Sequence, residues 1–433
     1  MSRVLAAVVA LLAFVVPASA DVPVARRVLG NGMTVLVRED PGVGVVTASL
    51  QVRAGSLFES EPTAGITNFM QRMLVRGTDK RSALALVEAA EDLGGSLEAS
   101  GEVEAAELRA ASIARHWEPL LGLLAEVVLQ PSFPAAELER ERRLLLGQLQ
   151  TRADNPFQRA FDTAVRDVYG AHPYAWPALG RMESVQRISR EDLVAHYRAT
   201  YRPDRMVLAV SGNVPPAAVI ATAERLFRRL PSPSGVPAVP VMEPMPRGEP
   251  RLVERDARQA QVLIGFLAPP VVHPDYAAVR VLTMVLGGGM SSRLFTELRD
   301  RRGLAYSVGV LTTARTGPAL FVPYLGTAPV NADAALAGML AEVQRIRGEA
   351  IDEQELARAR AYLLGTLAMD RRTNARLAFH LAFYELIGAG WDWPQRFARE
   401  IETVTVADVA RVAQRYLVRP TVVVLRPPKA GGR

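Results

Sequence analysis

The sequence predicts an α+β protein built from two homologous halves, and an internal repeat is the main reason. Residues 137–149 and 355–367 are identical at eight of thirteen positions, at an offset of 218 residues. Residues 196–212 parallel residues 413–428 at nearly the same offset. Two matches with a shared offset indicate a duplicated unit. Each unit mixes strand patterns with amphipathic helix patterns, which is typical of α+β domains.

The proposed join between the halves is residues 231–250, PSPSGVPAVPVMEPMPRGEP. This stretch is rich in proline and glycine and lacks helical periodicity, so we expect an extended linker. The domain boundaries that follow are 21–230 for the first half and 251–433 for the second.

Within the first half, strand patterns come first. Residues 34–40 and 45–55 are predicted strands joined by a turn at Pro41-Gly42. Residues 82–94 have helical periodicity that ends at a glycine pair, and residues 96–110 are predicted to form a pair of strands or a hairpin. The first half therefore mixes runs of strands with amphipathic helices.

Longer helices follow in the same half. Residues 116–130, 135–153 and 190–202 carry apolar side chains at helical spacing. Residues 205–214, RMVLAVSGNV, form an apolar run that predicts a closing strand. We therefore expect helices packed on a sheet in each half.

The first 20 residues have the composition of a secretory signal. One arginine precedes an apolar run that Pro17 interrupts, and Ala18-Ser19-Ala20 fits a cleavage site. We expect a periplasmic or secreted protein, with an uncleaved N-terminal anchor as the alternative. No later segment is apolar and long enough to cross a bilayer, so no membrane span is expected after cleavage.

Composition excludes several kinds of site. There is no cysteine, so disulfides, thiol nucleophiles and cysteine metal sites are excluded. No two histidines lie three or four residues apart, so no helical histidine pair exists. The five are His116, His172, His196, His273 and His380. Basic residues are not interleaved with aromatic ones, and nucleic acid is not an expected partner.

Residues 65–78, GITNFMQRMLVRGT, resemble the zinc helix of the inverted-zincin peptidases, the family of insulinase, pitrilysin and the mitochondrial processing peptidase, which carries H-x-x-E-H. The frame residues that match are Gly65, Ile66, Phe69, Met73, Leu74, Gly77 and Thr78. Further family landmarks occur in the expected order, at 131–142, 154–157, 172–180 and 287–308. The resemblance implies two α/β-roll domains facing each other as a clamp.

The residues that carry zinc chemistry in that family are replaced. Asn68, Gln71 and Arg72 stand where the resemblance places the first histidine, the general-base glutamate and the second histidine. The position of the third ligand, a glutamate, is occupied by Gln148. Amides are poor zinc ligands and arginine is a permanent cation, so we expect no metal bound by this chain and no catalytic residue in it alone. Glu141 is retained and could pair with Arg72 in place of a metal.

A second functional feature of the family is retained. In the segment 294–308, Arg299 and Tyr306 match an arginine and a tyrosine that, by the resemblance, bind the substrate carbonyl beside the zinc of the opposite half. Donors aimed at that oxygen stabilise the charge that develops in the transition state. Gly287-Gly288-Gly289 precedes this segment, but the absence of a lysine and of Walker spacing excludes a phosphate loop.

The leading hypothesis is a non-catalytic subunit of a periplasmic heterodimeric zinc metallopeptidase. Its partner would be a homologous subunit with intact H-x-x-E-H that holds the zinc, and the substrate an unfolded peptide. One alternative is a structural or peptide-binding scaffold with no role in proteolysis. Another is an independent peptidase with a different site.

Overall fold

The computed structural model describes residues 22–230 and 242–428. The predicted signal at 1–20 and the first part of the predicted linker lie outside the described residues. Residues 242–250, the rest of that linker, contain no helix or strand. Across the two described ranges, no helix combines the length and apolarity that a bilayer crossing requires.

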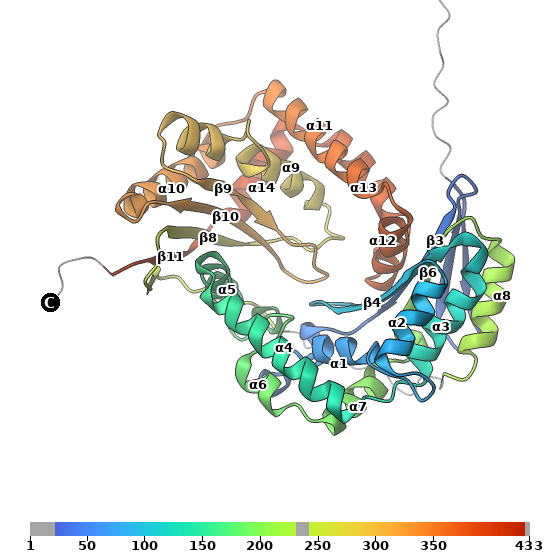
Figure 1. Cartoon of the computed structure of the whole chain (residues 1–433). Coiled ribbons are helices and arrows are strands. Elements are labelled where there is room, and N and C mark those ends of the chain that lie inside the picture. The colour runs from blue at the N-terminus through green and yellow to red at the C-terminus, as the bar shows by residue number, and fades with distance from the viewer. Residues whose placement is uncertain (1–21, 231–241, 429–433) are drawn as a thin grey trace, which may run out of the picture.

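A six-stranded sheet takes all its strands from the first half (Figure 1). Its strands are β1 Val24–Val28, β2 Thr34–Glu39, β3 Val45–Val52, β4 Ser96–Gly101, β5 Ala106–Ile113 and β6 Met206–Gly212, in the order β1-β2-β6-β3-β5-β4. The predicted strands are confirmed, but β2 and β3 are not adjacent. The strand β6 lies between them, parallel to β2 and antiparallel to β3. Every residue of β6 is buried, as a central strand requires.

A five-stranded sheet takes all its strands from the second half. Its strands are β7 Arg251–Glu254, β8 Ala260–Ala268, β9 Ser307–Thr312, β10 Ala319–Thr327 and β11 Thr421–Arg426, in the order β7-β11-β8-β10-β9. This order repeats β2-β6-β3-β5-β4, with one parallel pair followed by antiparallel pairs in both sheets. The shared topology confirms the duplication that the sequence repeat predicts.

Helices pack on these sheets. In the first half they are α1 Ile66–Leu74, α2 Ala83–Asp92, α3 Trp117–Leu129, α4 Ala135–Asp154, α5 Pro156–Tyr169, α6 Met182–Arg187, α7 Arg190–Thr200 and α8 Pro216–Phe227. In the second half they are α9 Tyr276–Gly287, α10 Ala332–Gly348, α11 Glu353–Asp370, α12 Asn374–Leu386, α13 Trp393–Thr403 and α14 Val406–Tyr416. The four predicted helices are present, and the side chains of Ser82 and Ser189 cap two of them.

Two of these helices are exchanged between the halves. The helix α5 belongs to the first half but packs on β8 and β11 of the second sheet, and α12 packs on β3 and β6 of the first sheet (Figure 1). Both contacts bury small residues. Ala160 and Ala164 of α5 are fully buried, as are Ala378 and Ala382 of α12.

The exchange is symmetric in sequence as well as in space. Ala160 and Ala378 are 218 residues apart, and so are Ala164 and Ala382, which is the offset of the sequence repeat. An alanine at every fourth residue lets the helix axis approach the sheet closely. Asn374 adds polar contacts, because it accepts from Ser211 at 2.9 Å and donates to the carbonyl of Val45 at 3.1 Å. Each half therefore completes the core of the other.

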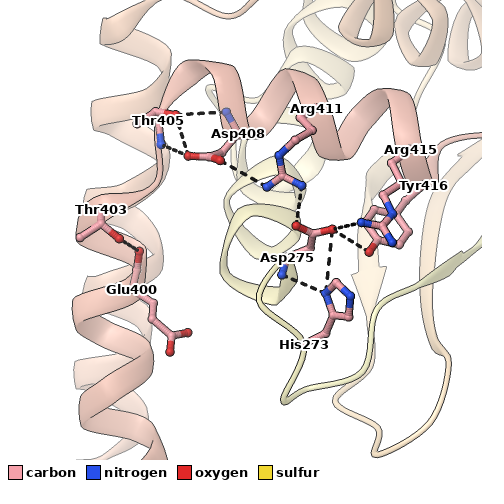
Figure 2. Close-up of polar contacts among 9 residues, drawn as sticks. All are labelled: His273, Asp275, Glu400, Thr403, Thr405, Asp408, Arg411, Arg415 and Tyr416. Atoms are coloured by element: carbon pink, nitrogen blue, oxygen red, sulfur yellow. Dashed lines mark hydrogen bonds and ion pairs between the residues drawn. The ribbon is translucent and has the colours of Figure 1, made fainter.

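A buried carboxylate joins α14 to the start of α9 (Figure 2). Asp275 accepts hydrogen bonds from Arg411 at 2.5 Å, Arg415 at 3.0 Å and the hydroxyl of Tyr416 at 2.8 Å, while its backbone N–H donates to Nδ1 of His273 at 3.0 Å. Burial raises the pKa of Asp275, but these donors outweigh it and hold the pKa below its ordinary value. All of its partners among the described residues belong to the second half, so the cluster stabilises that half.

Candidate functional site

The start of α1 is set by a glycine and a buried carboxylate. Gly65 has a φ of 92°, and a Cβ there would lie 2.5 Å from the Cα of Gly180. Glu59 accepts from the backbone N–H groups of Gly65 at 2.6 Å and Thr67 at 2.9 Å. Burial raises the pKa of Glu59, although these hydrogen bonds favour its ionised form. This capping fixes the start of α1, and α1 carries the motif positions Asn68, Gln71 and Arg72.

Arg72 lies at the centre of the site and joins α1 to α4. Its Nε donates to Oδ1 of Asn68 at 2.9 Å, and Nη2 donates to Oε1 of Gln148 at 2.6 Å. Its Nη1 lies 3.8 Å from Oε2 of Glu141. The structure therefore brings Asn68, Arg72 and Gln148 together. Burial lowers the pKa of Arg72, and Glu141 partly offsets this effect.

Glu141 has a second and closer partner. Oε1 of Glu141 accepts from Nε of Arg76 at 2.7 Å, and the carboxylate is 2% exposed. The pairing with Arg72 suggested by the sequence is therefore present, but Arg76 makes the direct hydrogen bond. Arg76 lies in the turn just after α1, which ends at Leu74, so the helical spacing of the motif did not point to it.

Gln71 lies on another face of α1. Its Nε2 donates to the hydroxyl of Tyr201 at 2.7 Å, and its Oε1 has no hydrogen-bond partner among the described residues. Gln71 is fully buried, and among the described residues no hydrogen bond joins its side chain to Arg72, Gln148 or Glu141. Asn68 faces the site and also donates to the carbonyl of Gly101 at 3.1 Å, which ties α1 to the edge strand β4.

Asn68 and Gln148 suit the guanidinium of Arg72 between them, and this set of side chains does not fit a zinc ion. Zinc in proteins is held by imidazole, thiolate or carboxylate groups. Here the amide oxygens of Asn68 and Gln148 accept hydrogen bonds from a permanently charged arginine. Within residues 22–230 and 242–428, no three His, Cys, Asp or Glu side chains are grouped so that they could hold a metal ion.

Arg299 and Tyr306 lie in the second half, close to each other in the chain. Arg299 belongs to a π-helical segment, Phe295–Arg301, and its guanidinium stacks on the ring of Phe295 at 4.8 Å. Tyr306 is 61% exposed, and its backbone N–H donates to Gly326 at 2.9 Å. In the part of the chain that the structure describes, no hydrogen bond or ion pair joins either side chain to the motif positions of the first half.

A cavity of about 380 Å³ lies beside the motif and is lined by both halves. Asn68 and Gly101 line it from the first half, and Thr313 and Arg315 from the loop between β9 and β10. Trp176, from the landmark segment 172–180, forms another part of its wall. The first-half motif and the second half therefore meet around one cavity.

The contact between the halves at this cavity depends on Glu104. This buried carboxylate accepts from the N–H of Thr316 at 2.9 Å, from the hydroxyl of Thr316 at 2.6 Å, and from the hydroxyl of Tyr174. The same tyrosine hydroxyl accepts from the N–H of Gly317 at 3.1 Å, and burial raises its pKa. Tyr174 belongs to the landmark segment 172–180, for which the sequence predicted no role, and no sequence pattern pointed to Glu104.

Comparisons with known proteins agree with this architecture. The family model described as insulinase (peptidase family M16) matches residues 34–180, and the one described as the peptidase M16 inactive domain matches residues 187–363. An uncharacterized zinc protease of Mycobacterium bovis is 31% identical over 93% of this chain and 92% of its own length. One from Rickettsia felis is 27% identical over 79% of this chain and 82% of its own.

Solved structures show the same fold. A crystal structure described as a peptidase M16 inactive domain from Pseudomonas fluorescens superimposes with a TM-score of 0.88, at 24% identity, over 95% of this chain and 99% of that one. The crystal structure of a protease from Helicobacter pylori also superimposes with a TM-score of 0.88. It is 22% identical, and the match covers 94% of this chain and 99% of that one. These likenesses confirm the predicted two-domain α+β fold.

Proposed function

The chain belongs to the insulinase family of peptidases, M16, and from that premise we propose that it is a non-catalytic subunit of a periplasmic zinc metallopeptidase. Its partner in the heterodimer is a homologous subunit with an intact H-x-x-E-H helix, which supplies the zinc and the general base. This chain binds no zinc itself. It positions an unfolded peptide and donates hydrogen bonds to the scissile carbonyl.

The observation that supports this proposal most is the environment of Arg72. The guanidinium is hydrogen-bonded by Asn68 and Gln148 and lies 3.8 Å from Glu141, at the motif positions of the family. A metal bound there would meet a fixed positive charge at short range, in a partly buried setting where repulsion is strong. Hydrolysis therefore depends on a zinc site in another chain.

The role in substrate binding is assigned to Arg299 and Tyr306. Neither side chain has an ion-pair partner in the described ranges, and both are exposed, so their donors are available to a peptide held between two subunits. Arginine keeps its charge at any physiological pH and tyrosine offers one hydroxyl donor. Both suit an oxygen that gains negative charge during the reaction.

The test is peptide hydrolysis by this chain co-purified with its zinc-bearing partner. Arg299→Ala and Tyr306→Phe should each lower the maximal rate about 100- to 1,000-fold, the usual effect of losing one donor to a developing oxyanion. Arg301→Ala is the matched control. Arg301 is an exposed neighbour whose guanidinium pairs, among the described residues, with Glu297 alone, so the activity of this variant should be unchanged. Gel filtration should show an intact heterodimer in every case.

Full activity in the Arg299→Ala, Tyr306→Phe double variant would contradict the assigned role. It would favour the alternative in which the chain is a scaffold for the partner. Elemental analysis provides a second test. After incubation with zinc and desalting, the isolated chain should hold far less than one zinc per molecule, and a stoichiometric zinc content would overturn the proposal.

A further inference from the structure

The cavity beside the motif has a larger neighbour. A second cavity, of about 730 Å³, lies between the C-terminal end of α4, the helices α5 and α6, and the strand β7. Its volume falls in the range of about 300–1,000 Å³ that is typical of ligand pockets. It shares Arg152, Asp162 and Trp176 with the smaller cavity beside the motif, so the two adjoin.

Arginines dominate the charged lining of this cavity. They are Arg152, Arg159, Arg166, Arg181 and Arg251, and the carboxylates that line it are Glu61, Asp162 and Glu183. All three carboxylates are paired. Asp162 receives two hydrogen bonds from Arg152, at 2.9 and 2.6 Å, and Arg181 pairs with Glu61 and lies 3.7 Å from Glu183. Arg251 is paired with Asp167, which is buried behind it.

Two arginines remain without a counter-ion. In the described part of the chain, the guanidinium groups of Arg159 and Arg166 have no hydrogen-bond or ion-pair partner, and both residues are exposed. They are seven residues apart on α5, which is close to two helical turns, so they lie on the same face. The cavity therefore presents an excess of positive charge with free donors.

The strand β7 gives the cavity a second property. It is the edge strand of the second sheet, paired on one side only with β11, and its residues Arg251, Leu252 and Val253 line the cavity. An edge strand carries backbone donors and acceptors that can pair with an added extended peptide. Leu252 is 48% exposed and offers an apolar contact.

We propose that this cavity binds an acidic peptide segment in an extended conformation, paired with the edge of β7 and neutralising Arg159 and Arg166. Charge complementarity selects an acidic occupant. The parts of this chain outside the structure, 1–21, 231–241 and 429–433, contain one acidic residue, Asp21. The bound segment is therefore part of another polypeptide. This binding goes beyond the proposed function and requires no zinc-bearing partner.

The experiment is fluorescence anisotropy with the mature full chain. The probe is a fluorescein-labelled peptide of about ten residues with glutamate at alternate positions, and the matched probe carries glutamine instead. The glutamate peptide should bind, and raising the ionic strength from about 0.05 to about 0.5 M should weaken it, since exposed charges are screened. Arg159→Ala and Arg166→Ala should each weaken binding about two- to fivefold.

Controls separate this site from general attraction to a basic protein. Arg198 is an exposed arginine on α7 that does not line the cavity, so Arg198→Ala should bind the probe as the parent does. Methylating alternate backbone nitrogens of the glutamate peptide should weaken binding, because an added strand needs those donors. Trp176 lines the cavity, so binding should change the intrinsic tryptophan fluorescence of the protein, and Trp176→Phe should abolish that change.

Three results with the peptides would overturn the proposal. They are the absence of binding, equal binding of the glutamine peptide, and unchanged binding by the Arg159→Ala, Arg166→Ala double variant. A single-stranded oligonucleotide of equal charge serves as competitor. If it binds the cavity more tightly than the peptide does, the occupant is a nucleic acid and the acidic peptide is rejected.

Discussion

Around Arg72, two arginines share one buried carboxylate. Glu141 is 2% exposed and contacts both Arg76 and Arg72, whereas Arg72 also has two amide acceptors. The network is therefore more dependent on Glu141 than on Arg72. Removing the carboxylate leaves two partly buried cations without a counter-ion, while removing Arg72 leaves Glu141 paired with Arg76.

The first prediction follows from this difference. Glu141→Ala should lower the free energy of unfolding by about 3 kcal/mol. Arg72→Ala should cost about 1–2 kcal/mol, the value of its hydrogen bonds to neutral acceptors. Urea unfolding monitored by circular dichroism would measure both. A larger loss for Arg72→Ala than for Glu141→Ala would contradict this account of the network.

The second prediction concerns a half-buried histidine next to α1. Burial, with a contribution from Arg205, lowers the pKa of His196 to about 4, and its Nε2 lies 2.9 Å from the hydroxyl of Thr67. Between pH 6.5 and pH 4 the unfolded chain binds a proton there that the folded chain does not. Stability contributed by this group is therefore complete above pH 6.5 and is lost as the pH falls toward 4.

From pH 7 to pH 5, His196 should account for a loss of about 2 kcal/mol in the free energy of unfolding, at about 1.4 kcal/mol per pH unit below 6.5. His196→Gln keeps a hydrogen-bonding partner for Thr67 and removes the titration. Unfolding at both pH values would measure the difference. If the variant loses as much stability as the parent, His196 is not the titrating group.

At the scale of single residues, the sequence predicted part of the candidate site around Arg72. The replacement residues Asn68, Arg72 and Gln148 were identified from the family frame, and the structure places them in contact. The partner of Gln71 was not predicted, because Tyr201 is 130 residues away in the chain and no local pattern connects them. Whether Arg299 and Tyr306 act on a substrate stays a prediction.

At the scale of elements, the exchanged helices α5 and α12 carry the contact between the halves. Apolar periodicity in the sequence predicts which face of a helix is buried, but it does not identify the sheet that covers the face. The repeat was therefore visible in the sequence, whereas the exchange was not. The same limit explains β6, whose apolar run predicts a buried strand without predicting its place between β2 and β3.

The third prediction tests the close packing of these helices. Ala164→Leu in α5 and Ala382→Leu in α12 should each destabilise the protein by about 1–3 kcal/mol, because a larger side chain forces the helix away from the sheet. Ala357 is an exposed alanine on α11, so Ala357→Leu is the control and should change stability by less than about 0.5 kcal/mol. Equal effects at all three positions would contradict the packing argument.

At the scale of the whole molecule, Glu104 holds the β9–β10 loop against the first half. The fourth prediction is that Glu104→Ala increases amide hydrogen exchange at Thr316 and Gly317 by about tenfold or more, since a buried hydrogen bond to a charged acceptor contributes about 1.5–3 kcal/mol. Glu88→Ala, at an exposed carboxylate of α2, provides the control. Unchanged exchange in the Glu104 variant would show that the loop is held by other contacts.

The exchange of α5 and α12 also bears on how the protein responds to proteolysis. A protease that cuts once between residues 231 and 250 separates the polypeptide into two fragments, but each fragment keeps a helix docked on the sheet of the other. The cut product should therefore migrate as one particle on gel filtration and as two bands only after denaturation. The two fragments would therefore remain assembled after such a cleavage.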